Sequence, residues 1–240
     1  MCTVTYLPLS SSSFILTSNR DESQQRKIAL PPEKYVIYET NVYFPKDTDA
    51  NGTWFAAAET KFTLCLLNGA FKSHERHPPY RLSRGLMLLD FFKYLNVRDF
   101  ISQYNFEGIE PFTLLILEQS PNTIIHEIKW DENKIHFGNK NAGVPSIWSS
   151  AQLYPKKVIK EREKWFDEWL TKNVFNIDNI VRFHKTGGSG NSYTDLLMSR
   201  DGKIFTVSIT SLLRKEKERL MRYEDMISEK VVEKTIKAEE

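Results

Sequence analysis

Strand-like patterns of apolar and polar residues near both ends of this chain constrain its fold more than any other feature. Residues 2–7 alternate in this way, residues 14–18 read as a second strand, and the serine-rich segment between them has the composition of a turn. Near the other end, residues 203–209 read as a strand of a hairpin around Asp201-Gly202, which is a strong turn dipeptide. Helical patterns lie between these ends. The chain is therefore predicted to be an α+β protein, a four-layer αββα sandwich of two mostly antiparallel sheets with helices outside.

Two helical patterns stand out in the middle of the chain. Ser83 is a suitable N-cap for a helix over residues 83–95. The stronger pattern lies within residues 155–172, where large side chains recur at spacings of three and four. A further helix is expected over residues 176–185, ended by Gly187-Gly188. More strands are expected at 53–58, 61–67, 112–119, 123–131, 134–137 and 196–198.

The composition argues against several classes of protein. Hydrophobic residues make up 40% of the 240 residues, enough for a substantial core. The formal net charge of +2 creates no strong field for nucleic acid or an anionic membrane. No apolar run reaches the ~18–20 residues of a transmembrane helix. We therefore expect no nucleic-acid partner and no membrane span, and the composition leaves the oligomeric state open.

The N-terminal segment and the cysteines indicate a cytoplasmic protein. The segment lacks the basic and apolar regions of a secretory signal. Cys2 and Cys65 are the only cysteines, so a disulfide framework is not expected. We expect one domain over residues 1–225 and a charged C-terminal tail over residues 226–240.

Cys2 is the first candidate for chemistry. If Met1 is removed, this residue carries both a thiol and a free α-amine, and an amine with a pKa near ~8 can act as the base for the thiol. The alternative is a small buried strand residue without chemistry.

The run Asn19-Arg20-Asp21-Glu22 directly follows the second predicted strand. A hairpin returns the chain beside its start, so Arg20 and Asp21 are expected near Cys2. Arginine beside a thiol lowers its pKa, and aspartate can orient an amine. The alternative is a solvated turn.

Asn68 ends the predicted strand 61–67, and an amide there can donate to an oxyanion. The alternative is an ordinary Asn-Gly turn with Gly69.

These segments together resemble the NRDE family, of the transport-and-Golgi-organisation type. The resemblance runs to about residue 210 and is most specific in the first 85 residues. It rests on Met1-Cys2, residues 19–22, Asn-Gly-Thr-Trp at 51–54, Leu-Asn-Gly at 67–69, Ser-Arg-Gly at 83–85 and residues 148–151.

That family is similar to N-terminal-nucleophile amidases such as choloylglycine hydrolase and penicillin V acylase. The resemblance implies Cys2 as nucleophile, with Arg20, Asp21 and Asn68 as the other catalytic residues. Expected substrate contacts are Asn19, Trp54, Ser150 and Asn191.

Two positions depart from the pattern of these relatives. Ser150 stands where the family usually has asparagine, and Asn191 aligns with an arginine. A neutral amide cannot replace a guanidinium in binding a carboxylate. The departures weaken the case for amide hydrolysis.

Three functions remain open at this point. The first is a cysteine amidohydrolase acting on a small acyl-amide. The second is a non-catalytic carrier of haem, acyl-CoA or lipid in the same pocket, as the resemblance also implies haem trafficking. The third is an interaction protein. No cofactor is expected, and His74 and His77 lack a third partner for a metal.

Overall fold

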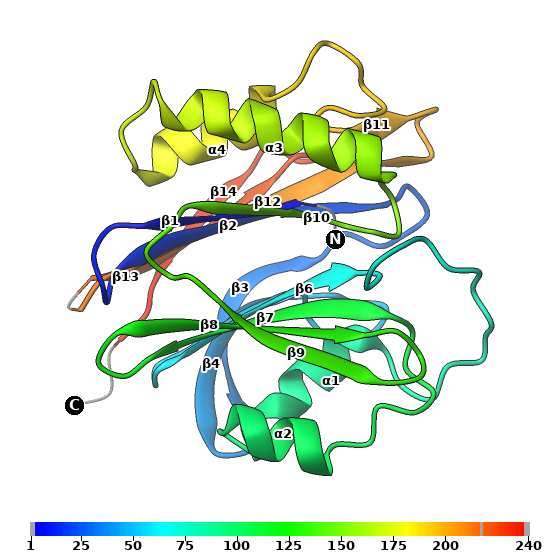
Figure 1. Ribbon diagram of the computed structural model, residues 1–240, viewed down its shortest axis with the longest axis vertical. Helices are drawn as coiled ribbons and strands as arrows, with labels where there is room; N and C mark the ends of the chain where they lie inside the picture. The colour runs from blue at the N-terminus through cyan, green and yellow to red at the C-terminus, as the bar shows by residue number, and fades with distance from the viewer. Residues whose placement is uncertain (1–2, 217, 238–240) are drawn as a thin grey trace.

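Two antiparallel sheets pack face to face in the computed structural model, which describes residues 3–216 and 218–237 (Figure 1). The first sheet has the order β10-β1-β2-β12-β13-β14, with β11 paired to β12. Its strands are β1 (Thr3–Pro8), β2 (Phe14–Ser23), β10 (Ser146–Ser149), β11 (Ser199–Arg200), β12 (Ile204–Arg214), β13 (Arg219–Asp225) and β14 (Val231–Thr235). The second sheet runs β3 to β9 in chain order. Its strands are β3 (Leu30–Ile37), β4 (Thr40–Lys46), β5 (Phe55–Ala58), β6 (Phe62–Asn68), β7 (Phe112–Gln119), β8 (Thr123–Trp130) and β9 (Ile135–Lys140).

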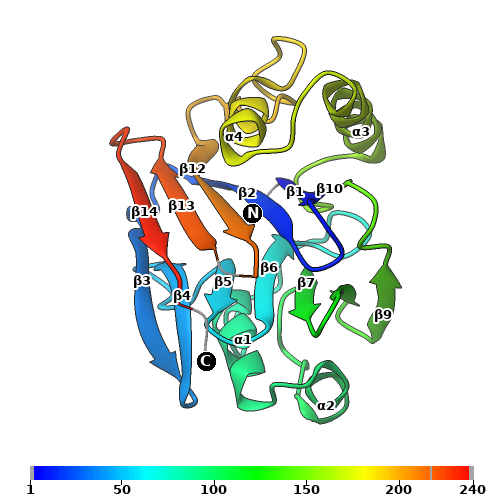
Figure 2. The same ribbon diagram turned by 90° about the vertical axis from the view of Figure 1, so that its left-hand side faces the viewer.

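Helices cover the outer face of each sheet, as Figures 1 and 2 show. The second sheet carries α1 (Arg84–Asp90), the 3-10 helix η1 (Phe91–Lys93) and α2 (Val97–Gln103). The first sheet carries α3 (Lys156–Leu170) and α4 (Ile177–Thr186). The predicted four-layer αββα sandwich is confirmed. Among the described residues, no helix is both long and apolar enough to cross a membrane.

The alternation within each strand explains the layers. In β1, Val4 and Tyr6 are buried in the core between the sheets, together with Cys65 from β6. Leu7 points the other way and packs with Phe166 of α3. Because successive side chains of a strand face opposite sides, one strand supplies both cores.

Side-chain caps begin two of the predicted helices. The Ser83 hydroxyl accepts a hydrogen bond from the Leu86 amide at the start of α1. Asn176 likewise accepts from the Asn179 amide at the start of α4. The α1 helix is shorter than expected, since its pattern continues as η1.

Several strands differ from what the sequence predicts. Residues 196–198 form no strand, and the short strand β11 begins at Ser199 instead. The run Asn19-Arg20-Asp21-Glu22 lies inside β2 rather than after it, because β12 pairs with β2 through this segment. The segment 30–46 forms β3 and β4, which the sequence pattern did not reveal. Residues 231–235 of the expected charged tail form β14, which pairs with β13.

Candidate functional site

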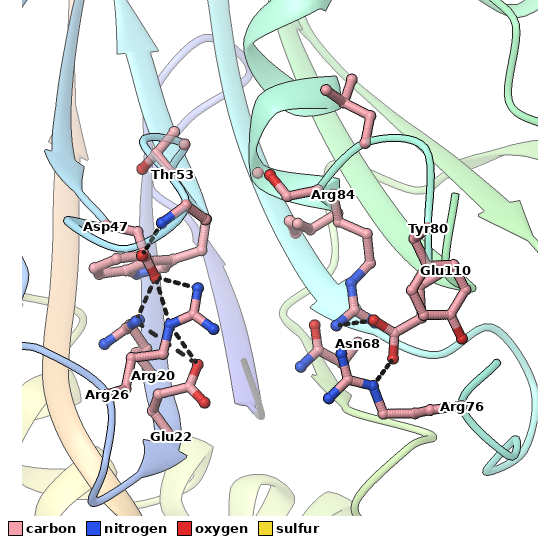
Figure 3. A pocket seen from close by; sticks show the side chains of 17 residues that line it. Arg20, Glu22, Arg26, Asp47, Thr53, Asn68, Arg76, Tyr80, Arg84 and Glu110 are labelled. Atoms are coloured by element: carbon pink, nitrogen blue, oxygen red, sulfur yellow. Dashed lines mark hydrogen bonds and ion pairs between the residues drawn. The ribbon is translucent and has the colours of Figure 1, made fainter. Parts of the chain in front are cut away.

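A pocket of about 320 Å³ opens where β2 of the first sheet faces the loop after β4 in the second sheet (Figure 3). Four arginines and three carboxylates line it, with polar and aromatic groups between them. The ionisable residues are Arg20, Glu22, Arg26, Asp47, Arg76, Arg84 and Glu110. The others include Thr53, Trp54, Leu66, Asn68, Tyr80, Ser83 and Gly85. The charged groups form two clusters on opposite sides of the pocket.

The first cluster is built around Arg20 of β2. Its guanidinium donates to the Asp47 carboxylate at 2.7 Å and lies 4.5 Å from the ring centre of Trp54. Only 4% of Arg20 is exposed. The carboxylate and the aromatic face hold the guanidinium in one orientation at the pocket wall.

Asp47 is the anchor of this cluster. One carboxylate oxygen pairs with the guanidiniums of Arg20 and Arg26, the latter at 3.0 Å. The other oxygen accepts hydrogen bonds from the backbone amides of Asp49 and Ala50. Burial would raise the pKa of Asp47, but the Ala50 amide and the two arginines outweigh it and hold that pKa below its ordinary value. Asp47 is therefore a fixed negative charge.

The second cluster is built around Glu110, which precedes β7. Its carboxylate pairs with Arg84 at 3.1 Å and with Arg76 at 3.2 Å, and His74 lies at 3.2 Å. Arg84 also donates to the carbonyl of Pro111. Burial lowers the pKa of Arg84 below its ordinary value although Glu110 opposes the shift.

The other face of β2 carries a separate buried network. Asp21 does not line the pocket, because alternation directs it away from Arg20. Its carboxylate accepts hydrogen bonds from Tyr154 at 2.9 Å and from Thr206 at 2.6 Å. Asn19 bonds to the His184 ring at 2.6 Å and to the Leu196 carbonyl at 2.7 Å.

A buried arginine from α3 joins this network to β1. Arg162 is fully buried and donates to the Thr3 hydroxyl at 2.6 Å and to the carbonyls of Thr194 and Asp195. Its guanidinium lies 3.6 Å from the ring centre of Tyr154. Arg162 lies on the buried side of α3, and its contacts there are polar.

The structure brings together only part of the predicted site. Arg20, Trp54 and Asn68 line one pocket. Asn19 and Asp21 lie on the opposite face of β2, and Asn191 is exposed in the loop after α4. Cys2 lies outside the described residues.

Ser150 supports the pocket without lining it. Its buried hydroxyl donates to the carbonyl of Asn68 at 2.8 Å. The bond holds the end of β6, from which the Asn68 side chain enters the pocket beside Arg84 in Figure 3.

Two of the motifs that carry the family resemblance, residues 51–54 and 83–85, pack against each other beside the pocket, and each contributes a glycine to the contact. A Cβ on Gly52 would lie 2.5 Å from the Gly85 carbonyl carbon, and one on Gly85 would lie 2.8 Å from the Thr53 carbonyl oxygen. The motif 51–54 and the motif 83–85 therefore pack backbone against backbone, which only glycine permits.

Gly69, in the third motif, follows Asn68. It has φ +82° and lies against the backbone of residues 151–152. Both features favour glycine at this position.

Several pocket residues escaped the sequence reasoning. Arg84 was inside a recognised motif and Glu22 inside another, yet neither was assigned a role. Asp47, Arg76 and Glu110 belong to no motif. Their positions depend on contacts between segments distant in sequence, so no local pattern signals them.

Comparison with known proteins identifies relatives of this architecture. The model of a family described as Transport and Golgi organisation 2 matches residues 1–224. A search of curated protein sequences found no match.

Three solved structures share the fold. A variant of conjugated bile acid hydrolase from Clostridium perfringens has TM-score 0.61 at 10% identity, covering 100% of this chain and 94% of that chain. A Caenorhabditis elegans N-acylethanolamine-hydrolyzing acid amidase ortholog has TM-score 0.53 at 13% identity, covering 88% and 92%. Penicillin V acylase from Agrobacterium tumefaciens has TM-score 0.50 at 10% identity, covering 98% and 86%. At these identities, the similarity shows the N-terminal-nucleophile hydrolase fold.

Proposed function

This chain belongs to the Transport and Golgi organisation 2 family, and we propose that it is a cysteine N-terminal-nucleophile hydrolase that cleaves the amide bond of a small acyl-amide. The observation that carries the proposal is that Arg20 and Asn68 line the same pocket. Thr3, the residue after Cys2 in the sequence, pairs with Asn19, the residue before Arg20. The names of the solved structures with this fold point to the same bond type.

In the proposed reaction, removal of Met1 frees the α-amine of Cys2. The amine takes the thiol proton and the sulfur attacks the amide carbon. The tetrahedral oxyanion receives a hydrogen bond from the Asn68 amide. Its collapse breaks the C–N bond, and the leaving amine takes the proton. Water then attacks the thioester, which releases the acid and restores the thiol.

The described residues supply the support for this reaction. Arg20 is held by Asp47 and Trp54, so its charge has a fixed position at the pocket. A fixed positive charge favours a thiolate over a thiol. Asp21 is proposed as an orienting group rather than a pocket residue, since its carboxylate is held by Tyr154 and Thr206. Asn19, Ser150 and Asn191 are not among the pocket-lining residues, and Trp54 is the proposed substrate contact.

The test uses protein whose Met1 has been removed, beside the Cys2→Ala variant. Both are given a panel of acyl-amides and a thiol-reactive amide mimic, and intact mass reports Met1 removal and labelling. Turnover by the parent protein and none by the variant is expected, because a methyl group cannot attack a carbonyl. Equal rates from both would refute the nucleophile assignment.

The alternative is a carrier of haem, acyl-CoA or lipid in the same pocket. A carrier would bind its ligand equally well with Cys2→Ala, and neither protein would turn over any amide. Binding measured on the same two proteins therefore separates the two functions.

A further inference from the structure

The charges of the pocket are not balanced between its two sides. On the Asp47 side, two arginines and two carboxylates line the pocket, and Glu22 lies 3.6 Å from Arg20. Around Glu110, two arginines share one carboxylate. The surplus positive charge therefore lies on the side formed by Arg76, Arg84 and Glu110, which we call the Glu110 wall.

The two arginines of the Glu110 wall differ in exposure. The side chain of Arg84 is 15% exposed, whereas that of Arg76 is 67% exposed. Arg84 is thus a cation fixed in the pocket, and Arg76 lies at its solvent-facing edge. Since each guanidinium has five N–H donors, one shared carboxylate cannot satisfy both.

The rigidity of this wall comes from the surrounding chain. The Arg84 guanidinium donates to the Pro111 carbonyl at 3.0 Å as well as to Glu110. The loop that carries Arg76 is anchored at His74, whose backbone amide and carbonyl both bond to the Gln152 side chain. A preorganised pair of guanidiniums can bind an incoming carboxylate through parallel hydrogen bonds.

We propose that the Glu110 wall binds a carboxylate of the ligand, so that the substrate class is an acyl-amide bearing a free carboxylate, such as an N-acyl amino acid. This inference rests on the proposed function in calling the ligand a substrate. The binding of a carboxylate at the Glu110 wall does not itself require catalysis. A cavity of about 320 Å³ is at the small end of ligand pockets, which suits a short acyl chain. Its largely polar wall disfavours a long apolar ligand.

The test measures binding to the Cys2→Ala protein by isothermal titration calorimetry, so that turnover plays no part. N-hexanoylglycine is compared with N-hexanoylethanolamine, which has the same acyl chain and a hydroxyl in place of the carboxylate. We expect the glycine compound to bind about tenfold more tightly or better, as a charge-assisted bidentate contact gives. Equal affinities would overturn the proposal.

Variants of Arg84 and Arg76 show which side chains cause the preference for N-hexanoylglycine. Arg84→Gln should remove it, and Arg84→Lys should keep only part of it, because lysine has the charge without the planar fork. Arg76→Gln should reduce it less, since that side chain is more exposed. Arg98→Gln on α2 removes one exposed arginine away from the pocket and should leave the preference unchanged.

Two further outcomes decide the inference. Arg84→Gln removes a buried group, so its thermal unfolding is recorded, and Arg76→Gln provides the test on an exposed position. A preference retained by both variants would overturn the proposal, as would tighter binding of inorganic phosphate than of N-hexanoylglycine. Selective binding of the glycine compound without hydrolysis by the parent protein would uphold this inference while refuting the proposed function.

Discussion

The phenol of Tyr154 donates a hydrogen bond to the carboxylate of Asp21 at 2.9 Å. This bond joins the segment before α3 to β2, the strand that contains Asn19-Arg20-Asp21-Glu22. Both residues are buried. The carboxylate also receives the Thr206 hydroxyl from β12 at 2.6 Å. Asp21 is thus held by groups on two other elements, which explains how a buried acidic residue is tolerated in the strand.

Tyr154→Phe should destabilise the protein by about 1–3 kcal/mol, because it leaves a buried carboxylate oxygen without its donor. Urea unfolding at neutral pH measures the change. Tyr193→Phe is the matched control, since Tyr193 donates to Asp201 on the exposed surface. That change should lie within about 0.5 kcal/mol. Equal effects at the two tyrosines would contradict the role given to the buried bond.

Gly85→Ala should destabilise the protein by about 1–3 kcal/mol, as overpacking does. The added methyl would lie 2.8 Å from the Thr53 carbonyl oxygen, and backbone atoms cannot move aside cheaply. Gly138→Ala in β9 is the control, because a Cβ there meets nothing within 4 Å. Thermal unfolding of both variants checks the prediction. A Gly85→Ala protein as stable as its parent would show that the two motifs do not pack as closely as described.

His184 should make stability depend on pH. Burial, with the charge of Arg162, lowers its pKa from 6.5 to about 3. The pKa of His184 in the folded protein lies below its ordinary value. Neutral His184 therefore contributes fully to the free energy of unfolding above pH 6.5, and this contribution is lost as the pH falls toward 3. In that window the free energy of unfolding should fall by about 1.4 kcal/mol for each unit by which the pH is lowered.

The measurement is urea unfolding of the parent protein and of His184→Gln from neutral to acidic pH. Glutamine does not titrate, so this part of the slope should vanish even if the variant is less stable at every pH. Parallel curves for the two proteins would mean that His184 is protonated as easily in the folded state as in the unfolded state.

Asp47→Ala should destabilise the protein by about 3 kcal/mol, because it removes the closest partner of a buried guanidinium. Arg20 would keep the more distant carboxylate of Glu22, at 3.6 Å, and the ring of Trp54. Asp49→Ala on the same loop should cost less than about 1 kcal/mol, since Asp49 contacts more exposed partners, Arg26 and Lys27. Denaturant unfolding distinguishes the two. A similar loss from both would indicate that the loop, rather than the Arg20 pair, sets the cost.

Local patterns predicted the elements whose own residues carry the signal. The residues of β1 alternate and are followed by a turn and an apolar run, and the stripe of α3 has the helical period, so the β1–β2 hairpin and α3 were both recognised. The strands β3 and β4 were missed because Pro31, Pro32 and Pro45 read as interruptions, although they lie within the observed strands. The sequence Asn19-Arg20-Asp21-Glu22 was placed outside β2 because four polar residues resemble a strand end.

Only the pocket residues that lie in recognised sequence motifs could be predicted. Arg20 and Asn68 were identified, but Asp47, which pairs with Arg20, and Glu110, which pairs with Arg84, come from loops whose positions are set by the packing of the two sheets. The same limit applies to Asp21. Its role as a pocket residue was inferred from the neighbourhood of Arg20 in sequence, whereas strand alternation directs the two side chains to opposite faces.

The two cysteines should differ sharply in reactivity. Cys65 is fully buried in the core between the sheets, and burial raises the pKa of its thiol to about 12. The thiolate is the reactive form, so Cys65 should not react with iodoacetamide in the native protein. The proposed nucleophile Cys2 should react, giving one adduct at neutral pH by intact mass and two in urea. A native adduct mapped to Cys65 would contradict its buried position, and a native protein with no adduct would count against an activated thiol at Cys2. The Cys2→Ala variant provides the matched control, because it should remain unlabelled until urea exposes Cys65.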